Sequence, residues 1–326
     1  MSFLNVLLRG AGQVMFQNNP VTGLLFLLGV LWAAFAAGTP AVAVGAMVGL
    51  LVSSITARWL QVDLESLKSG LYGYNGMLVG AALATFLKND YSLWFLVCVG
   101  GVCSTVTFMA IANILKTWEG PALTFPFVLV TWALLLAAYQ LSNIPIGSMA
   151  PPGLPAHVTA ESTAQIHSVT FWWEALCTGV SQVFLCGNPI TGIIFVVGLA
   201  VSSRWAAGLA VYGSFLAVIT ALFLGADPTT VQNGLYGFSP VLTAIALGCT
   251  FYKPSSRVLV FTTVATVSTV LAQAALDVAV MPLGIVSLTA PFVFTTWIFL
   301  LAKGNLAPLP HDTVTQSAFG DSGTVS

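Results

Sequence analysis

Two threonine-containing motifs carry the polar chemistry of this sequence. The run Leu-Thr-Phe-Pro-Phe at 123–127 returns as Leu-Thr-Ala-Pro-Phe at 288–292. Proline has no N–H and disrupts the helical turn before it, so nearby carbonyl groups lose their intrahelical partners. With the hydroxyls of Thr124 and Thr289, these carbonyls would form a row of acceptors for a solute rich in N–H donors. The alternative is that each proline only kinks a helix and each threonine bonds to its own backbone. Recurrence of the motif favours the acceptor row.

A second repeated motif places a glutamine shortly before an Asn-Pro pair. The run from Gln13 to Pro20 returns as the run from Gln182 to Pro189. Asparagine before proline is typical of a helix start, with asparagine as the cap and proline just inside the helix. The glutamine amide, which is both donor and acceptor, could contact a polar neutral solute before that break.

A third motif brings aromatic rings to matched positions. Gly-Leu-Tyr-Gly-Tyr at 70–74 returns as Gly-Leu-Tyr-Gly-Phe at 234–238. A single aromatic residue in such a chain usually faces lipid or the core. Matched rings at Tyr74 and Phe238, next to glycines, could instead form flat slots that select a planar molecule.

The three motifs recur in the same order after 169, 164 and 165 residues. A nearly constant offset indicates an internal duplication. We therefore predict four parts: a first repeat at 1–141, an external linker at 142–170, a second repeat at 171–303 and a polar C-terminal tail at 304–326.

Composition places the chain in a membrane. Of its 326 residues, 57% are hydrophobic and 6% are charged, whereas soluble domains average about 25% charged residues. The net charge of −1 gives no reason to expect a nucleic-acid partner. Cysteines and histidines lack metal-ligand spacing, and no nucleophile–base pair or phosphate-binding loop occurs. We therefore predict no enzyme activity, no catalytic residue, no metal and no cofactor.

The apolar segments predict an all-α polytopic fold with ten spans, because a helix needs about 20 apolar residues to cross a bilayer. Each half contains five spans and one shorter, interrupted segment, which we interpret as a half-membrane helix at 108–123 and at 277–287. An odd number of crossings inserts the second copy upside down, and inverted repeats place their shared site near the bilayer midplane. The predicted spans are 14–37, 40–58, 70–87, 92–107, 124–141, 174–203, 205–224, 234–252, 257–275 and 289–302.

The basic residues support this topology. With a cytoplasmic N-terminus, eight of the nine lysines and arginines fall on the cytoplasmic side, and Lys88 alone falls outside. This is the positive-inside pattern. We expect a multi-pass protein of the inner (plasma) membrane with both termini in the cytoplasm.

Acidic residues bear on the mechanism. Glu119 and Asp277 fall at the predicted half-helices and Glu174 at the edge of a span, so no predicted span buries a charge at mid-depth. Ion-coupled transporters usually keep such a charge, and its absence favours a passive channel for a neutral solute. An ion-coupled transporter that uses Glu174 or Asp277 remains an alternative. An ammonia channel, which commonly uses paired intramembrane histidines, and a small-amide channel are further alternatives.

The three motifs resemble those of the urea transporters, and the likeness extends over residues 9 to 302. The resemblance implies five transmembrane helices and one tilted half-helix in each inverted repeat. It also implies a homotrimer in the lipid bilayer, in which each subunit conducts urea passively through its own pore. That pore would have a slot of aromatic rings at each mouth and a ladder of oxygen atoms in the middle.

The resemblance also assigns residues to the pathway. Leu185 departs from the expected aromatic ring, and Gln182 stands where some bacterial relatives carry an acid. One mouth would be lined by Gln13, Val14, Phe16, Tyr74 and Leu78, the other by Gln182, Val183, Leu185, Phe238 and Leu242, and the middle by Thr124 and Thr289.

Overall fold

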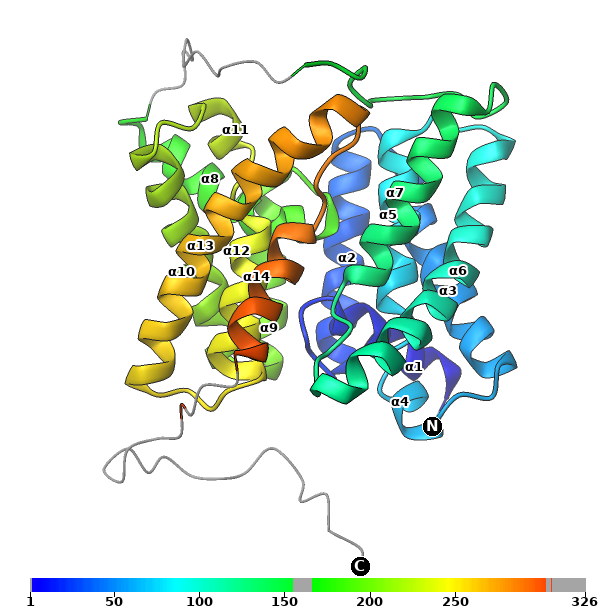
Figure 1. Ribbon diagram of the computed structural model, residues 1–326, viewed down its shortest axis with the longest axis horizontal. Coiled ribbons are helices and arrows are strands. Elements are labelled where there is room, and N and C mark those ends of the chain that lie inside the picture. The colour runs from blue at the N-terminus through cyan, green and yellow to red at the C-terminus, as the bar shows by residue number, and fades with distance from the viewer. Residues whose placement is uncertain (1, 155–165, 303–305, 307–326) are drawn as a thin grey trace, which may run out of the picture.

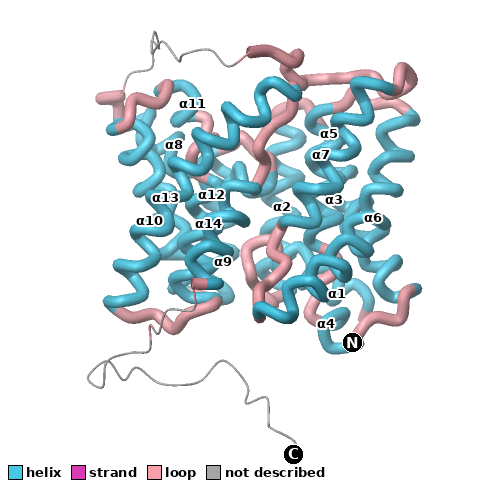
Figure 2. The backbone as a smooth tube through the Cα atoms, viewed as in Figure 1, coloured by secondary structure: helices cyan, strands magenta, loops and turns pink. Residues whose placement is uncertain are grey.

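The computed structural model of the protein describes residues 2–154, 166–302 and 306, and within these ranges the chain forms helices without strands (Figure 2). The predicted tail lies outside the described residues except for residue 306, as does 155–165 of the predicted linker. The helices of the first half are α1 (Phe3–Gln13), α2 (Pro20–Ala36), α3 (Pro40–Trp59), α4 (Leu64–Lys68), α5 (Tyr74–Phe86), α6 (Tyr91–Leu115), the 3-10 turn η1 (Lys116–Trp118) and α7 (Phe125–Gln140).

The second half repeats this order from α8 to α14. Its members are α8 (Val169–Ser181), the 3-10 turn η2 (Gln182–Phe184), α9 (Pro189–Ser202), α10 (Arg204–Phe223), α11 (Pro228–Gln232), α12 (Phe238–Ile245), the π-helical turn η3 (Ala246–Thr250), α13 (Ser256–Val280), the 3-10 turn η4 (Met281–Leu283) and α14 (Ala290–Leu301). The duplication predicted from the motifs therefore extends to the secondary structure, because α1 to α7 correspond one by one to α8 to α14.

Several of these helices suit a membrane. By length and composition, four helical segments of the described chain could each cross a bilayer: α3, α6 with η1, α10, and α13 with η4. Shorter apolar helices are α2, α5, α7, α12 with η3, and α14. Helix α8 with η2 meets α9 at an angle of 71°, which makes this pair either a broken span or a re-entrant loop.

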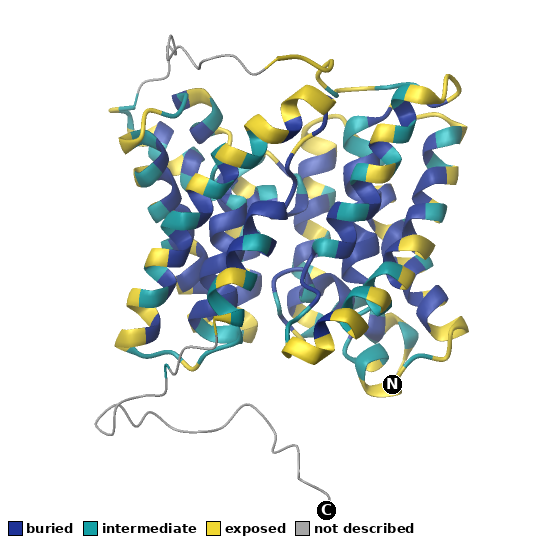
Figure 3. Cartoon of the chain, in the orientation of Figure 1, coloured by how far each residue is buried: buried dark blue, intermediate teal, exposed yellow. Residues whose placement is uncertain are grey.

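The corresponding short helices α4 and α11 lie at opposite faces of the helical body (Figure 1). The N-terminal end and α4 lie at the lower face, whereas α11 and the connection that follows α7 lie at the upper face (Figure 1). Buried residues gather in the middle of the body, and exposed ones lie on its outer sides and ends (Figure 3). The first half thus runs from the lower face to the upper face, and the second half returns.

Helices α2 and α9 join the halves through reciprocal contacts. The Thr22 hydroxyl donates to the Gly198 carbonyl at 2.7 Å, and the Thr191 hydroxyl donates to the Gly29 carbonyl at 3.0 Å. All four residues occupy matched positions in the repeats. When residue i contacts j and the copy of j contacts the copy of i, the two surfaces are related by an approximate two-fold axis.

Glycines let α3 and α5 approach closely. A Cβ atom at Gly49 would lie 2.0 Å from the Gly76 oxygen, and one at Gly80 would lie 2.0 Å from the Gly45 oxygen. Small residues at such spacing are the usual device for packing helices in membranes, where the hydrophobic effect does not drive helices together.

The Asn-Pro motifs begin helices, as predicted. The Asn19 side chain accepts hydrogen bonds from the backbone N–H groups of Val21 and Thr22, and the Asn188 side chain accepts one from Thr191. In both copies the proline is the first helical residue.

The predicted half-helices at 108–123 and 277–287 are wrong. Residues 108–115 complete the 25-residue helix α6, and residues 277–280 complete α13. The breaks come later, where Glu119 and Gly284 adopt left-handed φ values of 57° and 67°. Lys116 and Glu119 therefore mark a helix end and not an interrupted crossing. The predicted spans 14–37 and 174–203 also need correction, because short helices α1 and α8 end before the Asn-Pro motifs.

Candidate functional site

Thr124 and Thr289 meet at the centre of the protein. They precede α7 and α14 directly, and their Oγ1 atoms lie 2.7 Å apart. Both are almost fully buried, with exposed fractions of 2% and 3%. Neither side chain caps its own helix. The alternative of a threonine bonded to its own backbone is therefore not found, since the two hydroxyls bond to each other across the repeats.

Backbone geometry before the pair is unusual and matched. Leu123 and Leu288 adopt left-handed φ values of 51° and 52°. For a residue with a Cβ atom this conformation costs about 1–2 kcal/mol, and such outliers cluster at functional sites. In each half this left-handed residue directly precedes the threonine and places it in the contact between the halves.

Two tryptophans form hydrogen bonds from each half to the segment that precedes the threonine of the other half. Trp132 Nε1 donates to the Val286 carbonyl, and Trp297 Nε1 donates to the Pro121 carbonyl, both at 2.8 Å. Each accepting carbonyl lies three residues before a central threonine. The reciprocal bonds therefore hold the two threonine segments in register, and they repeat the approximate two-fold relation seen between α2 and α9.

The carbonyl groups beside the threonines differ between the halves. The Leu123 carbonyl already accepts from the Tyr74 hydroxyl and, at 3.4 Å, from Asn75 Nδ2. Phe238 replaces that tyrosine in the second half and has no hydroxyl. Within the described residues no hydrogen bond ends on the Leu288 carbonyl. One carbonyl of the expected acceptor row is thus occupied, whereas its counterpart remains available.

The two motif glutamines make equivalent backbone contacts. Gln13 Nε2 donates to the Ser69 carbonyl at 2.9 Å, and Gln182 Nε2 donates to the Asn233 carbonyl at 3.0 Å. These acceptors immediately precede the repeated Gly-Leu-Tyr-Gly motifs. Each amide nitrogen is therefore engaged by a backbone carbonyl, which leaves the amide oxygen as the group that a solute could contact.

A cavity of about 520 Å³ leads from the linker side of the protein to Thr289. It brings together five residues that the sequence assigned to the pathway, namely Gln182, Val183, Leu185, Phe238 and Thr289. Thr124 adjoins it through its hydrogen bond to Thr289. Besides Thr124, the predicted residues that do not line this cavity are Gln13, Val14, Phe16, Tyr74, Leu78 and Leu242.

Most of these remaining residues lie in the helical core. Val14, Leu78 and Leu242 are at most 1% exposed, and Tyr74 is 7% exposed. The Phe16 ring packs edge-on against Phe292, with 6.1 Å between the ring centroids. Phe16 is thus directed toward the helix that begins just after Thr289.

Sequence reasoning missed several residues of the cavity. Phe127, in the repeated Pro-Phe pair, lines it, as do Phe86, Gln273, Asp277 and Ser287. Repetition of Pro-Phe could have indicated Phe127. The placement of Asp277 at a half-helix was wrong, since it lies within α13, where Gln273 and Ser287 donate hydrogen bonds to its carboxylate.

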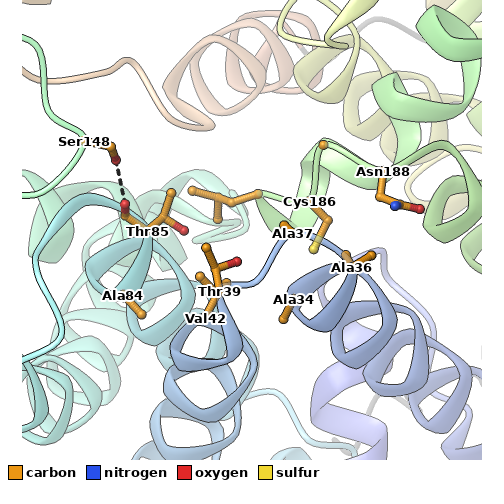
Figure 4. A pocket seen from close by; sticks show the side chains of 13 residues that line it. Ala34, Ala36, Ala37, Thr39, Val42, Ala84, Thr85, Ser148, Cys186 and Asn188 are labelled. Atoms are coloured by element: carbon orange, nitrogen blue, oxygen red, sulfur yellow. Dashed lines mark hydrogen bonds between the residues drawn. The ribbon is translucent and has the colours of Figure 1, made fainter.

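A second hollow, of about 470 Å³, adjoins this cavity (Figure 4). Thr85 and Leu185 line both spaces. The Ser148 hydroxyl donates to the Thr85 carbonyl at 2.6 Å, which attaches the connection after α7 to the end of α5. The walls of the second hollow include many alanine side chains, from α2, α5 and the turn between α2 and α3.

Comparison with known proteins gives one consistent result. The family described as "Urea transporter" matches residues 4–304. Proteins named urea transporter 1 are similar to this chain: that of Ovis aries is 30% identical over 322 residues, covering 97% of this chain and 82% of the relative. That of Rattus norvegicus is 30% identical over 324 residues, with the same coverage. That of Mus musculus is 33% identical over 255 residues, covering 77% of this chain and 64% of the relative.

Proposed function

This chain belongs to the urea transporter family, and we propose that it conducts urea passively, down its gradient, through a pore in each subunit. Membership of the family and the apolar helices make it a multi-pass membrane protein that transports urea in a channel-like manner. We further propose the route that urea takes, the residues along it and the absence of coupling to an ion gradient.

The observation that carries the proposal is the contact between Thr124 and Thr289. Urea is planar, neutral and rich in N–H donors, and an uncompensated polar group in an apolar interior costs several kcal/mol. Each hydroxyl retains an acceptor lone pair when the two bond to each other, and the Leu288 carbonyl adds a further acceptor. Urea that leaves water at the cavity would find these oxygens at the point where the halves meet.

The mouths of the pore would select for shape. On the linker side, Phe238 and Phe127 line the cavity with Leu185, so a flat apolar slot can form there without a ring at residue 185. On the opposite side we assign Phe16 and Tyr74 to the corresponding slot.

The rest of the route would connect the slots to the centre and to the two aqueous sides. Narrow stretches between the slots and the threonines would be lined by Val14, Leu78, Val183 and Leu242. The oxygens of Gln13 and Gln182 would accept N–H bonds at the two entrances.

We propose ten spans in two inverted repeats, with the half-membrane helices moved from their predicted positions to α1 and α8. The spans would then be α2, α3, α5, α6 and α7 in the first repeat, and α9, α10, α12, α13 and α14 in the second. The opposite positions of α4 and α11 and the reciprocal contacts between the halves support this arrangement.

The limits of the parts follow from this topology. The repeats would occupy 1–141 and 171–303, joined by the external linker 142–170, and the tail 304–326 would be cytoplasmic. Basic residues indicate that both termini face the cytoplasm of the inner membrane. The resemblance to urea transporters supports a homotrimer with one pore per subunit.

Urea flux into proteoliposomes, followed by stopped-flow light scattering, tests the proposed substrate. Purified protein should accelerate urea entry well above that of protein-free liposomes. Ammonia and formamide, measured in the same vesicles, test the two alternative channels. Entry of ammonia but not urea would refute the proposal.

A further inference from the structure

We propose that the cavity on the linker side contains a binding subsite for a small planar cation of the guanidinium type, centred on Asp277, Gln273 and Ser287. A cation held there would lie in the entrance to the route assigned above and would compete with urea. This cation would be a second ligand of the cavity, and its binding can be measured without any urea transport.

The three side chains form a connected polar group on α13 and the segment before α14. Gln273 Nε2 donates to both carboxylate oxygens of Asp277 at 3.0 Å and to Ser287 Oγ at 2.7 Å. The Ser287 hydroxyl also donates to Asp277. All three residues line the cavity. Ser287 lies two residues before Thr289, which places the group next to the central threonines.

The orientation of Gln273 leaves an acceptor without a donor. A carboxylate only accepts hydrogen bonds, so the amide nitrogen must face Asp277 and the amide oxygen must face away. Gln273 is 2% exposed, and among the residues that the structure describes its Oε1 has no hydrogen-bond partner. A buried acceptor in this condition costs about 1–3 kcal/mol. Because this oxygen is closed to solvent, a ligand in the cavity would be recognised first by the Asp277 carboxylate.

The charge of the group also lacks a partner. Among the residues that the structure describes, no lysine or arginine lines the cavity or bonds to Asp277. A carboxylate with two donors from neutral side chains still has lone pairs free for an approaching cation. The ligand that completes the group should therefore be positively charged and rich in donors.

The first repeat forms the equivalent helices without this polar group. At the offset of 165 residues, the first half has Phe108, Ala112 and Ala122 in place of Gln273, Asp277 and Ser287. That half builds the same succession of helix, 3-10 turn and helix with apolar residues. A carboxylate without a positively charged partner in the described chain, present in only one mouth, therefore indicates a ligand.

The surroundings favour a planar cation over an alkali ion. The cavity is lined largely by apolar groups, among them the rings of Phe86, Phe127 and Phe238. Guanidinium is weakly hydrated, stacks on aromatic faces and donates to a carboxylate through two N–H groups at once. Sodium or potassium would need oxygen ligands to replace its whole hydration shell, and this cavity offers few.

Equilibrium binding of radiolabelled guanidinium to the purified full-length protein tests the subsite. We expect saturable binding that unlabelled guanidinium displaces and that sodium, potassium and tetramethylammonium chloride at equal ionic strength do not. Asp277→Asn should weaken binding at least about tenfold, the loss expected for a charged hydrogen-bonded contact. Glu174→Gln is the matched control, because Glu174 bonds to Gln232 outside the cavity and should leave binding unchanged.

Ser287→Ala provides a second variant, since it copies Ala122 of the first half and keeps the carboxylate. It should also weaken binding, which decides the matter if Asp277→Asn does not fold. Equal binding by wild type and both variants, displacement by sodium as effective as by guanidinium, or no saturable binding would each overturn the proposal. Because no urea is present, these outcomes do not depend on whether urea is conducted.

Discussion

Replacing the central hydroxyls with methyl groups should slow urea without unfolding the protein. Valine has nearly the shape of threonine but offers no hydrogen bond, so Thr124→Val and Thr289→Val each remove one oxygen from the contact measured at 2.7 Å. Leaving one urea N–H unpaired costs about 1–3 kcal/mol. A barrier raised by about 1.4 kcal/mol slows passage roughly tenfold. Each variant should therefore lose on the order of tenfold in urea flux per folded protein.

The double variant sharpens this prediction. If both oxygens serve the same urea molecule, the combined loss should differ from the sum of the two, because effects of residues in contact are not additive. Thr131→Val is the matched control, because Thr131 lies in α7, is fully buried and has a hydroxyl without a hydrogen-bond partner in the described part of the chain. Flux is measured by stopped-flow light scattering and normalised to protein that elutes as a single folded species. A double variant with the flux of the wild type would refute the oxygen site.

Three further predictions concern the scaffold that positions the threonines. Thr22→Val with Thr191→Val removes both reciprocal bonds between α2 and α9, and each loss should cost about 1 kcal/mol of unfolding free energy; an unchanged thermal midpoint in detergent would contradict this. Gly49→Leu should abolish recovery of folded protein, because even its Cβ would lie 2.0 Å from a backbone oxygen of α5, whereas Gly208→Leu, which meets nothing within 4 Å, should be tolerated. Asn19→Ala removes the cap of α2 and should destabilise the protein by about 1 kcal/mol, measured as a lower thermal midpoint; equal midpoints would show that the cap is dispensable.

The repeated motifs predicted the parts of the fold that depend on local chemistry. Asparagine followed by proline favours a helix start through contacts within a few residues, so the starts of α2 and α9 could be predicted from sequence. The pairing of Thr124 with Thr289 could be predicted because two copies of one motif in a duplicated chain tend to meet near a common axis. Family membership, inferred from the same motifs, is confirmed by the comparisons.

Features that depend on tertiary packing were not predictable in the same way. Lys116 and Glu119 interrupt an apolar run in the sequence. Such charged residues can either interrupt a membrane span or mark the end of a complete helix, and the packing of the helix decides between the two. The occupation of the Leu123 carbonyl by Tyr74 also requires a contact between distant segments. Asp277 lines the cavity because the chain turns back after η4 and brings Ser287 next to it. The sequence does not show this turn.

The most direct test of passive conduction is urea flux in one preparation of proteoliposomes, measured without ion gradients and then with an imposed proton or sodium gradient. The oxygens at the threonine contact are neutral and Asp277 lines only the entrance, so a passive pore should give the same initial rate in all three conditions, a rate that follows the urea gradient alone. A rate that rises with either ion gradient, or urea accumulation above the external concentration, would contradict passive conduction and would identify an ion-coupled transporter.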